Sequence, residues 1–174
     1  MKKILFYPFC FLFLLSCNKE NNLDNYRGLI INEFLASNDY CCADSFGDFD
    51  DWVELYNDSE ESIDIGGMFF TDTPGDDKLY KIPDDDPLTT TILPKGFLIL
   101  WCDDDQEQGA LHLSKKLRGS GESVILIEKD GLTVIDSITY PTQITDQSMG
   151  RNIENLDEWI FYEIPTPGAA NYIN

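Results

Sequence analysis

The sequence predicts an all-β sandwich, and two observations support this prediction. Short runs rich in Val, Ile, Leu and aromatic residues recur along the 174 residues, and each run is bounded by Gly, Pro, Asn or Asp. No stretch has the pattern of a convincing amphipathic helix, since the best candidate, LHLSKKL at 111–117, is too short. About seven short strands separated by turn residues are typical of a two-sheet sandwich.

The predicted strands are spread over most of the chain. They are LIINEFL (29–35), DWVELYN (51–57), GGMFFTD (66–72), GFLILWC (96–102), SVILIEK (123–129), TVIDSITY (133–140) and EWIFYEI (158–164). KDG at 129–131 predicts a hairpin turn, because Asp-Gly tolerates the positive φ angles of primed turns. Within DWVELYN, the period of two places Val53 and Leu55 on one face and Glu54 on the other.

Two glutamates lie within otherwise apolar strands. A carboxylate at Glu33 or Glu54 needs a partner or a metal to be tolerated there. Arg151 is a candidate partner. Near the C-terminus, the prolines and the glycine of the segment IPTPGAAN (164–171) are features that end a sheet edge.

The chain begins MKKILFYPFCFLFLLSC, which has the order of a secretory signal: a basic head, an apolar run from 4 to 15 and a small-residue cleavage site. The apolar run is too short for a hydrocarbon core of about 30 Å. Leu-Leu-Ser-Cys resembles the lipobox of bacterial lipoproteins, which implies that Cys17 becomes the lipidated first residue of the mature chain. Several acyl chains would hold it at a membrane, since each buried methylene contributes about 0.8 kcal/mol.

The leader predicts three parts and a location. Residues 1–16 are expected to form the signal peptide, 17–28 the lipidated cysteine with its polar tether, and 29–174 the domain. The expected location is the bacterial cell envelope, with the lipid anchor in the outer membrane. The NKE that follows the cysteine partly resembles the signal that sends some lipoproteins to the cell surface, so the periplasmic and surface orientations both stay open.

The net charge of −20 disfavours nucleic acid as a partner and favours divalent cations. Binding to nucleic acid depends on Lys and Arg that displace counterions from phosphates. The sequence has 12 Lys and Arg against 32 Asp and Glu and no basic stripe, so we expect no direct binding to DNA or RNA. The acidic excess suits solubility and divalent cations.

An acidic loop, ADSFGDFDDWVE, is the best candidate for metal chemistry. It carries Asp44, Asp48, Asp50 and Asp51, and Ca²⁺ takes six to eight hard oxygen ligands of this kind. The spacing is not that of an EF-hand, because Phe and Leu occupy the third and twelfth positions. We place a weak calcium site at Asp48, Asp50 and Asp51, against the alternative of solvated loop charge.

The sequence has no recognisable combination of catalytic residues. His112 is the single histidine, and no serine lies in a Gly-x-Ser-x-Gly motif, so a serine triad cannot be assembled. With 32 acidic residues, a pair of carboxylates occurs at any chosen spacing and has no specificity for glycoside hydrolysis. We therefore predict that the protein is not an enzyme and that His112 is exposed or merely packed.

Three cysteines lie in the predicted domain. Cys102 could form a disulfide with Cys41 or Cys42 in an oxidising envelope, or all three could remain free thiols. A zinc site is disfavoured, because adjacent cysteines lack the usual two-residue spacer.

An ordered set of motifs resembles the lamin tail domains of bacteria. The set is IINEFLASN, DWVELYN, SIDIGGMFFTD, ILPKGFLILWC, LRGSGESVILIEKDG, VIDSITY, MGR and TPGAAN. The resemblance covers almost the whole predicted domain and implies an immunoglobulin-like β-sandwich. Lamins join this tail to a long coiled coil, whereas this sequence has no apolar heptads, so we expect no filament assembly.

These observations predict a membrane-anchored module that binds a protein or glycan of the envelope without turning it over. The acidic segments 39–51, 73–77 and 102–109 are the expected contacts, because a sandwich presents loops at its ends. The alternatives are an accessory domain that assists an envelope hydrolase, a calcium-dependent adhesion module and an unrecognised hydrolase. An exposed aromatic patch favours a binding module, and a cleft of acids with perturbed pKa values favours a hydrolase.

Overall fold

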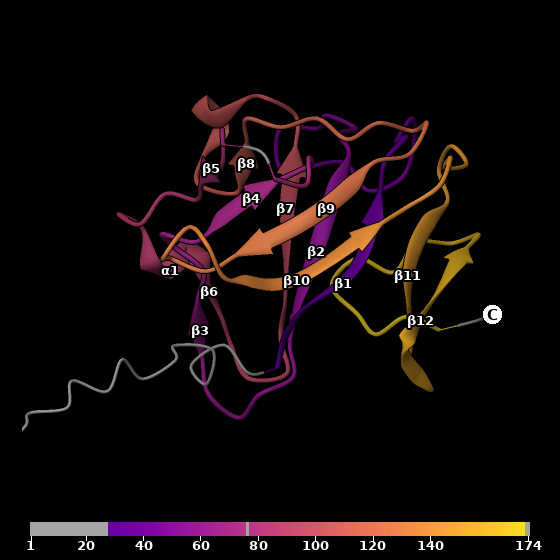
Figure 1. Ribbon diagram of the computed structural model, residues 1–174. Coiled ribbons are helices and arrows are strands. Elements are labelled where there is room, and N and C mark those ends of the chain that lie inside the picture. Colours follow the sequence, from indigo (N-terminus) through magenta and orange to yellow (C-terminus); the bar gives the residue numbers. More distant parts are fainter. Residues whose placement is uncertain (1–27, 76, 173–174) are drawn as a thin grey trace, which may run out of the picture.

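Two main β-sheets pack face to face in the computed structural model, which describes residues 28–75 and 77–172 (Figure 1). The predicted signal peptide, the lipid site at Cys17 and the tether up to residue 27 lie outside the described residues. No helix among the described residues is long and apolar enough to cross a membrane.

The larger sheet has the strand order β12-β11-β1-β2-β7-β8. Its strands are β1 (Leu29–Leu35), β2 (Trp52–Asn57), β7 (Phe97–Cys102), β8 (His112–Leu113), β11 (Ser148–Asn152) and β12 (Asn155–Tyr162). Neighbouring strands are antiparallel, except that β8 runs parallel to β7.

The smaller sheet has the order β10-β9-β4-β5, and a separate pair joins β3 to β6. The strands are β3 (Ile63–Asp64), β4 (Phe69–Thr71), β5 (Tyr80–Lys81), β6 (Thr91–Ile92), β9 (Ser123–Ile127) and β10 (Val134–Thr139). A single helical turn, α1 (Pro87–Thr90), and a 3-10 turn, η2 (Gln106–Gln108), complete the elements.

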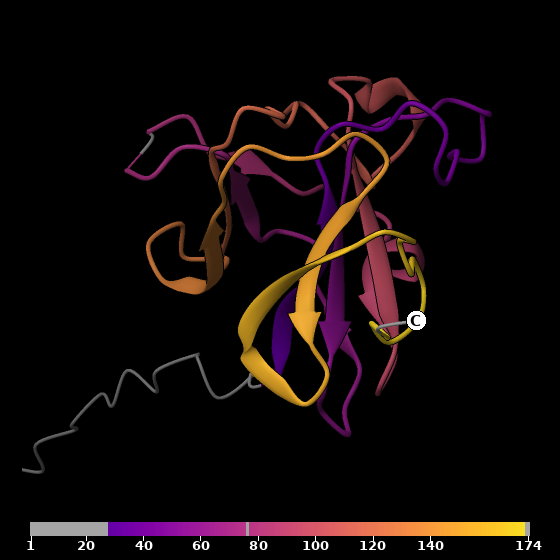
Figure 2. The same ribbon diagram turned by 90° about the vertical axis from the view of Figure 1, so that its right-hand side faces the viewer.

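The apolar core lies between the two sheets, which are seen edge-on in Figure 2. The alternation predicted for β2 is confirmed, because Val53 and Leu55 are fully buried in one cluster with Phe70 and Leu126 of the smaller sheet. Each such side chain stabilises the fold by about 1.5–3 kcal/mol relative to an exposed position. The sheet pairing therefore follows from the apolar faces of the strands.

The predicted strands are present, with shorter bounds at 66–72 and earlier bounds at 158–164. The segment 111–117 contains β8 and no helix, and the sequence analysis missed β11 and the two-residue strands. The hairpin at 129–131 forms, but only Gly131 has a positive φ, of 70°. Asp130 instead uses its carboxylate to accept the Leu132 and Thr133 amides at 2.8 Å.

A β-bulge in β1 changes which side chains reach the outer face of the larger sheet. Ile31 pairs with Leu55 and Glu33 pairs with Glu54, so Asn32 is the extra residue between them. A bulge of this kind re-aims side chains by breaking the period of two. As a result, Asn32 and Glu33 both reach the face that points away from the core, where they contact Glu54 and the C-terminal residues.

The pairing of β1 with β2 defines the two ends of the sandwich. Leu29 pairs with Asn57 at the end where the described chain enters, which we call the entry end. Leu35 pairs with Trp52 at the opposite end, which we call the far end. Seven residues of β1, at about 3.3 Å each, separate these ends by about 20 Å. The loop that follows β1 therefore projects from the far end (Figures 1 and 2).

Candidate functional site

The loop of residues 38–51 is held at the far end by contacts on both sides of its base. The backbone N–H of Asn38 donates to Asp51 Oδ1 at 3.1 Å, and Asn38 Nδ2 donates to the Asp50 carbonyl at 2.8 Å. Asp146, in the segment before β11, accepts the backbone N–H groups of Asp39 and Tyr40, each at 2.8 Å. The two ends of the loop are thus hydrogen-bonded to each other, and the loop is also hydrogen-bonded to the segment before β11.

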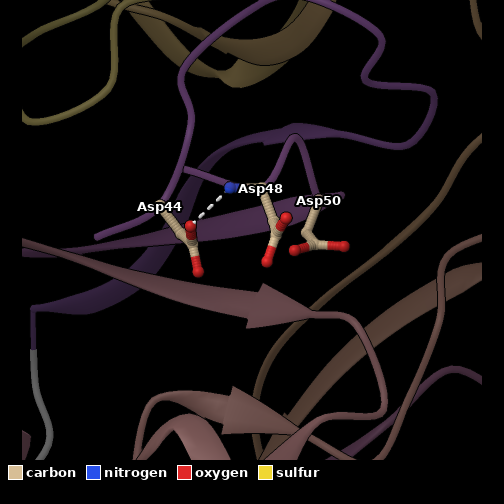
Figure 3. A group of neighbouring side chains, drawn as sticks. All are labelled: Asp44, Asp48 and Asp50. Atoms are coloured by element: carbon tan, nitrogen blue, oxygen red, sulfur yellow. Dashed lines mark hydrogen bonds between the residues drawn. The ribbon is translucent and has the colours of Figure 1, made fainter. Parts of the chain in front are cut away.

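Three carboxylates converge within this loop. One oxygen from each of Asp44, Asp48 and Asp50 lies within 4.8 Å of the other two. Figure 3 shows the Asp48 side chain between those of Asp44 and Asp50. Asp44 Oδ1 also accepts the backbone N–H groups of Phe46 and Asp48, at 2.9 and 2.8 Å, which curls the loop around it.

The predicted trio of calcium ligands is therefore placed differently by the structure. Asp48 and Asp50 come together, but with Asp44 in place of Asp51. The carboxylate of Asp51 is turned toward the base of the loop, where it accepts the Asn38 amide. Asp51 is therefore engaged at the base of the loop, and it is not among the three acids that converge.

The environment of these acids shifts two of their pKa values. Partial burial raises the pKa of Asp50, and the nearby carboxylates of Asp103, Asp44 and Asp48 raise it further. Burial raises the pKa of Asp51 to about 6, although the Asn38 amide opposes the shift. Within the cluster, Asp50 thus holds its negative charge at some cost, which a bound cation would relieve.

Calcium at millimolar concentration is expected to raise the melting temperature of the domain, because a ligand that binds only the native state stabilises it. The Asp48→Asn/Asp50→Asn double variant should lose most of this shift, whereas Asp51→Asn should keep it. Differential scanning fluorimetry with Ca²⁺ and Mg²⁺ checks the prediction. Equal shifts with the two ions, or an unchanged shift in the double variant, would leave only charge screening.

Three aromatic side chains of the same loop are exposed. The exposed fractions of Tyr40, Phe46 and Phe49 are 80%, 60% and 46%. The rings of Tyr40 and Phe49 lie 6.5 Å apart at 61°, and Phe46 meets the ring of His112 edge-on at 6.0 Å. Exposed aromatics gathered in one loop are typical of recognition surfaces, since they bury a large area on binding.

His112 is buried, which decides between the two predicted states in favour of packing, and it has a partner that the sequence analysis missed. Its Nδ1 contacts the buried carboxylate of Asp103, and its ring stacks on Trp101 at 6.3 Å. The sequence feature that indicated the burial of His112 is its position between two leucines in LHL. Its ring neighbours Asp103, Trp101 and Phe46 orient and pack it, and no serine, threonine or cysteine is among them.

The cysteines differ from both predicted arrangements. Cys41 and Cys42 are joined to each other by a disulfide, and Cys102 is a buried free thiol. A bridge from Cys102 is therefore wrong, as is the alternative of three free thiols. Burial raises the pKa of the Cys102 thiol well above its ordinary value, so it stays protonated and unreactive.

The predicted requirement of Glu33 and Glu54 for partners is confirmed, but the partners are other residues than expected. Glu33 accepts hydrogen bonds from the Ser148 hydroxyl and from the backbone N–H and hydroxyl of Thr166. Glu54 accepts from Asn32 Nδ2 at 2.8 Å and from the backbone N–H of Gly168. Both carboxylates are fully buried.

Arg151 was the expected partner, and this prediction is wrong. Its neighbour Gly150 faces the outer side of β11, where an added Cβ would lie 3.2 Å from Glu33 Cγ. The alternation along β11 therefore turns Arg151 to the inner side. There Arg151 Nη2 donates to both carboxylate oxygens of Asp136, at 2.9 and 2.7 Å.

Residues 163–172, which we call the C-terminal strap, cross the outer face of the larger sheet (Figure 2). Asn171 is its main contact: Nδ2 donates to the carbonyls of Asn32 and Arg151, and Oδ1 accepts from Asn32 Nδ2 and the Thr166 hydroxyl. The segment IPTPGAAN thus does more than end a sheet edge. Its Thr166 and Gly168 supply the donors that allow two carboxylates to be buried.

Burial shifts the pKa values of the two glutamates, and the donors of the strap oppose the shift. Burial raises the pKa of Glu33, and it raises that of Glu54 to about 7, with the nearby Glu33 adding to the shift of Glu54. Perturbed acids of this kind can mark a catalytic cleft. Here the strap covers them and donates to them, so they form a structural network.

The comparison with known protein families agrees with this architecture. The sequence model of the Lamin Tail Domain family matches residues 24–142, which is more than half of the chain. Among curated proteins, none matches this chain. The matched region contains β1 to β10, and the structure adds β11, β12 and the strap to it.

Proposed function

The chain belongs to the Lamin Tail Domain family, and from this premise we propose that its immunoglobulin-like module binds a partner at the bacterial cell envelope without catalysing a reaction. One observation carries the proposal. The loop at the far end exposes Tyr40, Phe46 and Phe49 beside a cluster of carboxylates, which is the feature expected of a binding module.

Features of the described residues support a module without catalysis. Glu33 and Glu54, which are fully buried and have raised pKa values, are covered by the C-terminal strap. Two surface hollows, of about 100 and 330 Å³, are lined without a carboxylate. These two hollows therefore lack the converging acids that a hydrolase of this composition would use.

The proposed anchor is a lipid on Cys17, which follows a basic and apolar leader in Leu-Leu-Ser-Cys. The described chain begins at the entry end, about 20 Å along β1 from the far-end loop. An anchor that precedes Gly28 would attach the entry end to the membrane, in the outer membrane of the envelope. The far-end loop would then face a partner across the envelope or outside the cell.

Metabolic labelling with a fatty acid tests the anchor. The wild-type chain is expected to incorporate the label and to partition into the membrane fraction, and Cys17→Ala is expected to lose both properties. Ser16→Thr, which leaves the cysteine in place, serves as the matched control. Equal labelling of the wild-type chain and Cys17→Ala would reject lipidation at this residue.

A calcium-dependent adhesion module is the second candidate, and the convergence of Asp44, Asp48 and Asp50 favours it. An accessory role beside an envelope hydrolase would use the same surface with an enzyme as the partner. Pull-down from envelope extract, with and without calcium, distinguishes these cases by the identity of the captured protein. Turnover of a peptide, ester, phosphate or glycoside library by the purified domain would overturn the binding proposal itself.

A further inference from the structure

We propose that the far-end surface docks a lysine- or arginine-rich segment of a partner protein. The far-end surface is the loop of residues 38–51 together with the adjoining residues 103–107 and Asp146. The inference rests on the proposed function, in which the domain is a binding module, and it adds the chemistry of the partner.

Three separate segments at this end of the sandwich carry acidic residues. They are Asp39, Asp44, Asp48 and Asp50 from the loop after β1, Asp103, Asp104, Asp105 and Glu107 from the segment after β7, and Asp146 before β11. Contacts between the segments show that they adjoin. Asp146 accepts the amides of Asp39 and Tyr40, and the backbone N–H of Cys102, next to Asp103, donates to the Asp51 carbonyl at 2.8 Å.

Lys116 is a basic residue near this group, and it offsets only part of the charge around Asp50. Lys116 opposes the rise in the pKa of Asp50, but its influence is smaller than that of Asp103, Asp44 or Asp48. A surface with one sign of charge concentrates oppositely charged partners and raises their rate of association. The same field repels anionic polymers and anionic lipid headgroups, which leaves cationic segments as the complementary class.

The aromatic rings are an independent observation that favours a cationic protein segment. A cation is attracted to the face of a single ring and needs no coplanar set of rings. The rings of Tyr40 and Phe49 are inclined at 61°, and those of Phe46 and His112 at 79°, so neighbouring rings form no common plane. The exposed rings lie in the same loop as the converging carboxylates, so guanidinium or ammonium groups are attracted by both features.

The position of the surface is consistent with a protein partner. The far end lies opposite the end at which the tether enters, so an anchored chain would leave the aromatic loop accessible. The loop is also fastened at its base by Asn38, Asp51 and Asp146. A fastened loop loses little conformational freedom on binding, which favours affinity.

The test uses the soluble chain from Asn18 to Asn174, which contains the whole described sandwich, in buffer with EDTA so that no divalent cation contributes. The probe is a fluorescent peptide of twelve residues in which arginine and glycine alternate. Fluorescence anisotropy is expected to show binding that weakens by about tenfold or more between 50 and 300 mM NaCl, as expected for a charged interface.

Paired variants separate the surface from the overall charge. Phe46→Ala/Phe49→Ala and Asp48→Asn/Asp50→Asn should each weaken binding by about tenfold, since rings and carboxylates both contact the cation. The aromatic control is Phe161→Ala/Tyr172→Ala, whose rings are 41% and 58% exposed elsewhere on the chain. The charge control is Asp85→Asn/Glu163→Gln, which removes two exposed acids outside the far end. Both controls should change affinity by less than about twofold.

Three outcomes would overturn the inference. Equal losses in the far-end variants and the controls would mean that the peptide senses only net charge. Equal binding of the matched glutamate–glycine peptide would remove the charge argument. Binding of an N-acetylglucosamine oligomer without binding of the arginine peptide would assign the surface to a glycan. The last outcome would leave the proposed binding function intact, so the two failures can be distinguished.

Discussion

Replacing Arg151 by methionine is expected to lower the free energy of unfolding by about 3–5 kcal/mol, because it leaves the largely buried carboxylate of Asp136 without its cationic partner. The side chains of Arg151 and Asp136 are 11% and 17% exposed. Asp136 belongs to β10 of the smaller sheet and Arg151 to β11 of the larger one. The ion pair therefore fastens the two sheets together at one edge of the sandwich.

Arg151 makes further contacts that methionine cannot reproduce. Its Nε donates to the Ile31 carbonyl at 2.8 Å, its Nη1 donates to the Leu156 carbonyl, and its guanidinium carbon lies 4.8 Å from the centre of the Trp159 ring. The Ile31 carbonyl precedes the bulge in β1 and is partly buried, so loss of Arg151 would remove a donor from it. Water can replace the donor at the Leu156 carbonyl, because that residue is exposed.

Urea unfolding of three variants checks this prediction. Arg151→Met should show the full loss, and Arg151→Lys should recover part of it, because lysine keeps the charge but lacks the planar fork that binds both Asp136 oxygens. Arg151→Met/Asp136→Asn should be more stable than Arg151→Met, because it removes the unpaired charge. A loss below about 1 kcal/mol for Arg151→Met would show that the pair is only a surface contact.

The contacts of Glu54 and Arg151 could be predicted from the sequence only in part. The apolar alternation of β2 predicted its two faces correctly, and it also predicted that Glu54 would need a partner. The identity of the partner depended on the bulge at Asn32 and on the face of β11. Neither feature has a local sequence signal, because MGR and INE fit a regular strand as well as a bulged one.

The candidate site was predictable in part for a similar reason. The acidic loop and its three aromatic residues are evident in the sequence, and the predicted turns place the loop between strands. Which carboxylates meet is set by the fold of the loop around Asp44, which accepts the amides of Phe46 and Asp48. The contacts of the loop with His112 and Asp146 join residues far apart in the chain, so spacing could not reveal them.

The stability of the domain is expected to fall as the pH rises from about 4.5 to about 7, and Glu54 is expected to cause a large part of the change. Burial raises the pKa of this carboxyl from 4.5 to about 7 in the folded chain. Between these values the folded state holds a proton that the unfolded state releases, so a higher pH favours unfolding. Above pH 7 both states are ionised, and the effect of Glu54 is complete.

The expected size follows from the shift in pKa. One unit corresponds to about 1.36 kcal/mol, so the shift of Glu54 amounts to about 3 kcal/mol lost across this range of pH. The raised pKa values of Glu33 and Asp51 act in the same direction and add to the slope. General repulsion among the many acids adds as well, so the slope of the wild-type chain alone does not identify Glu54.

The variant Glu54→Gln isolates the contribution, because it keeps the shape of the side chain and removes its charge. Its free energy of unfolding should differ between pH 5 and pH 8 by about 2–3 kcal/mol less than that of the wild-type chain. Glu163→Gln, which removes an exposed acid of the same type, should leave the wild-type slope unchanged. Urea unfolding at pH 5, 6, 7 and 8 measures the three slopes. Parallel profiles for Glu54→Gln and the wild-type chain would mean that Glu54 is ionised in the folded protein throughout this range, with the strap donors Thr166 and Gly168 holding the charge of the network.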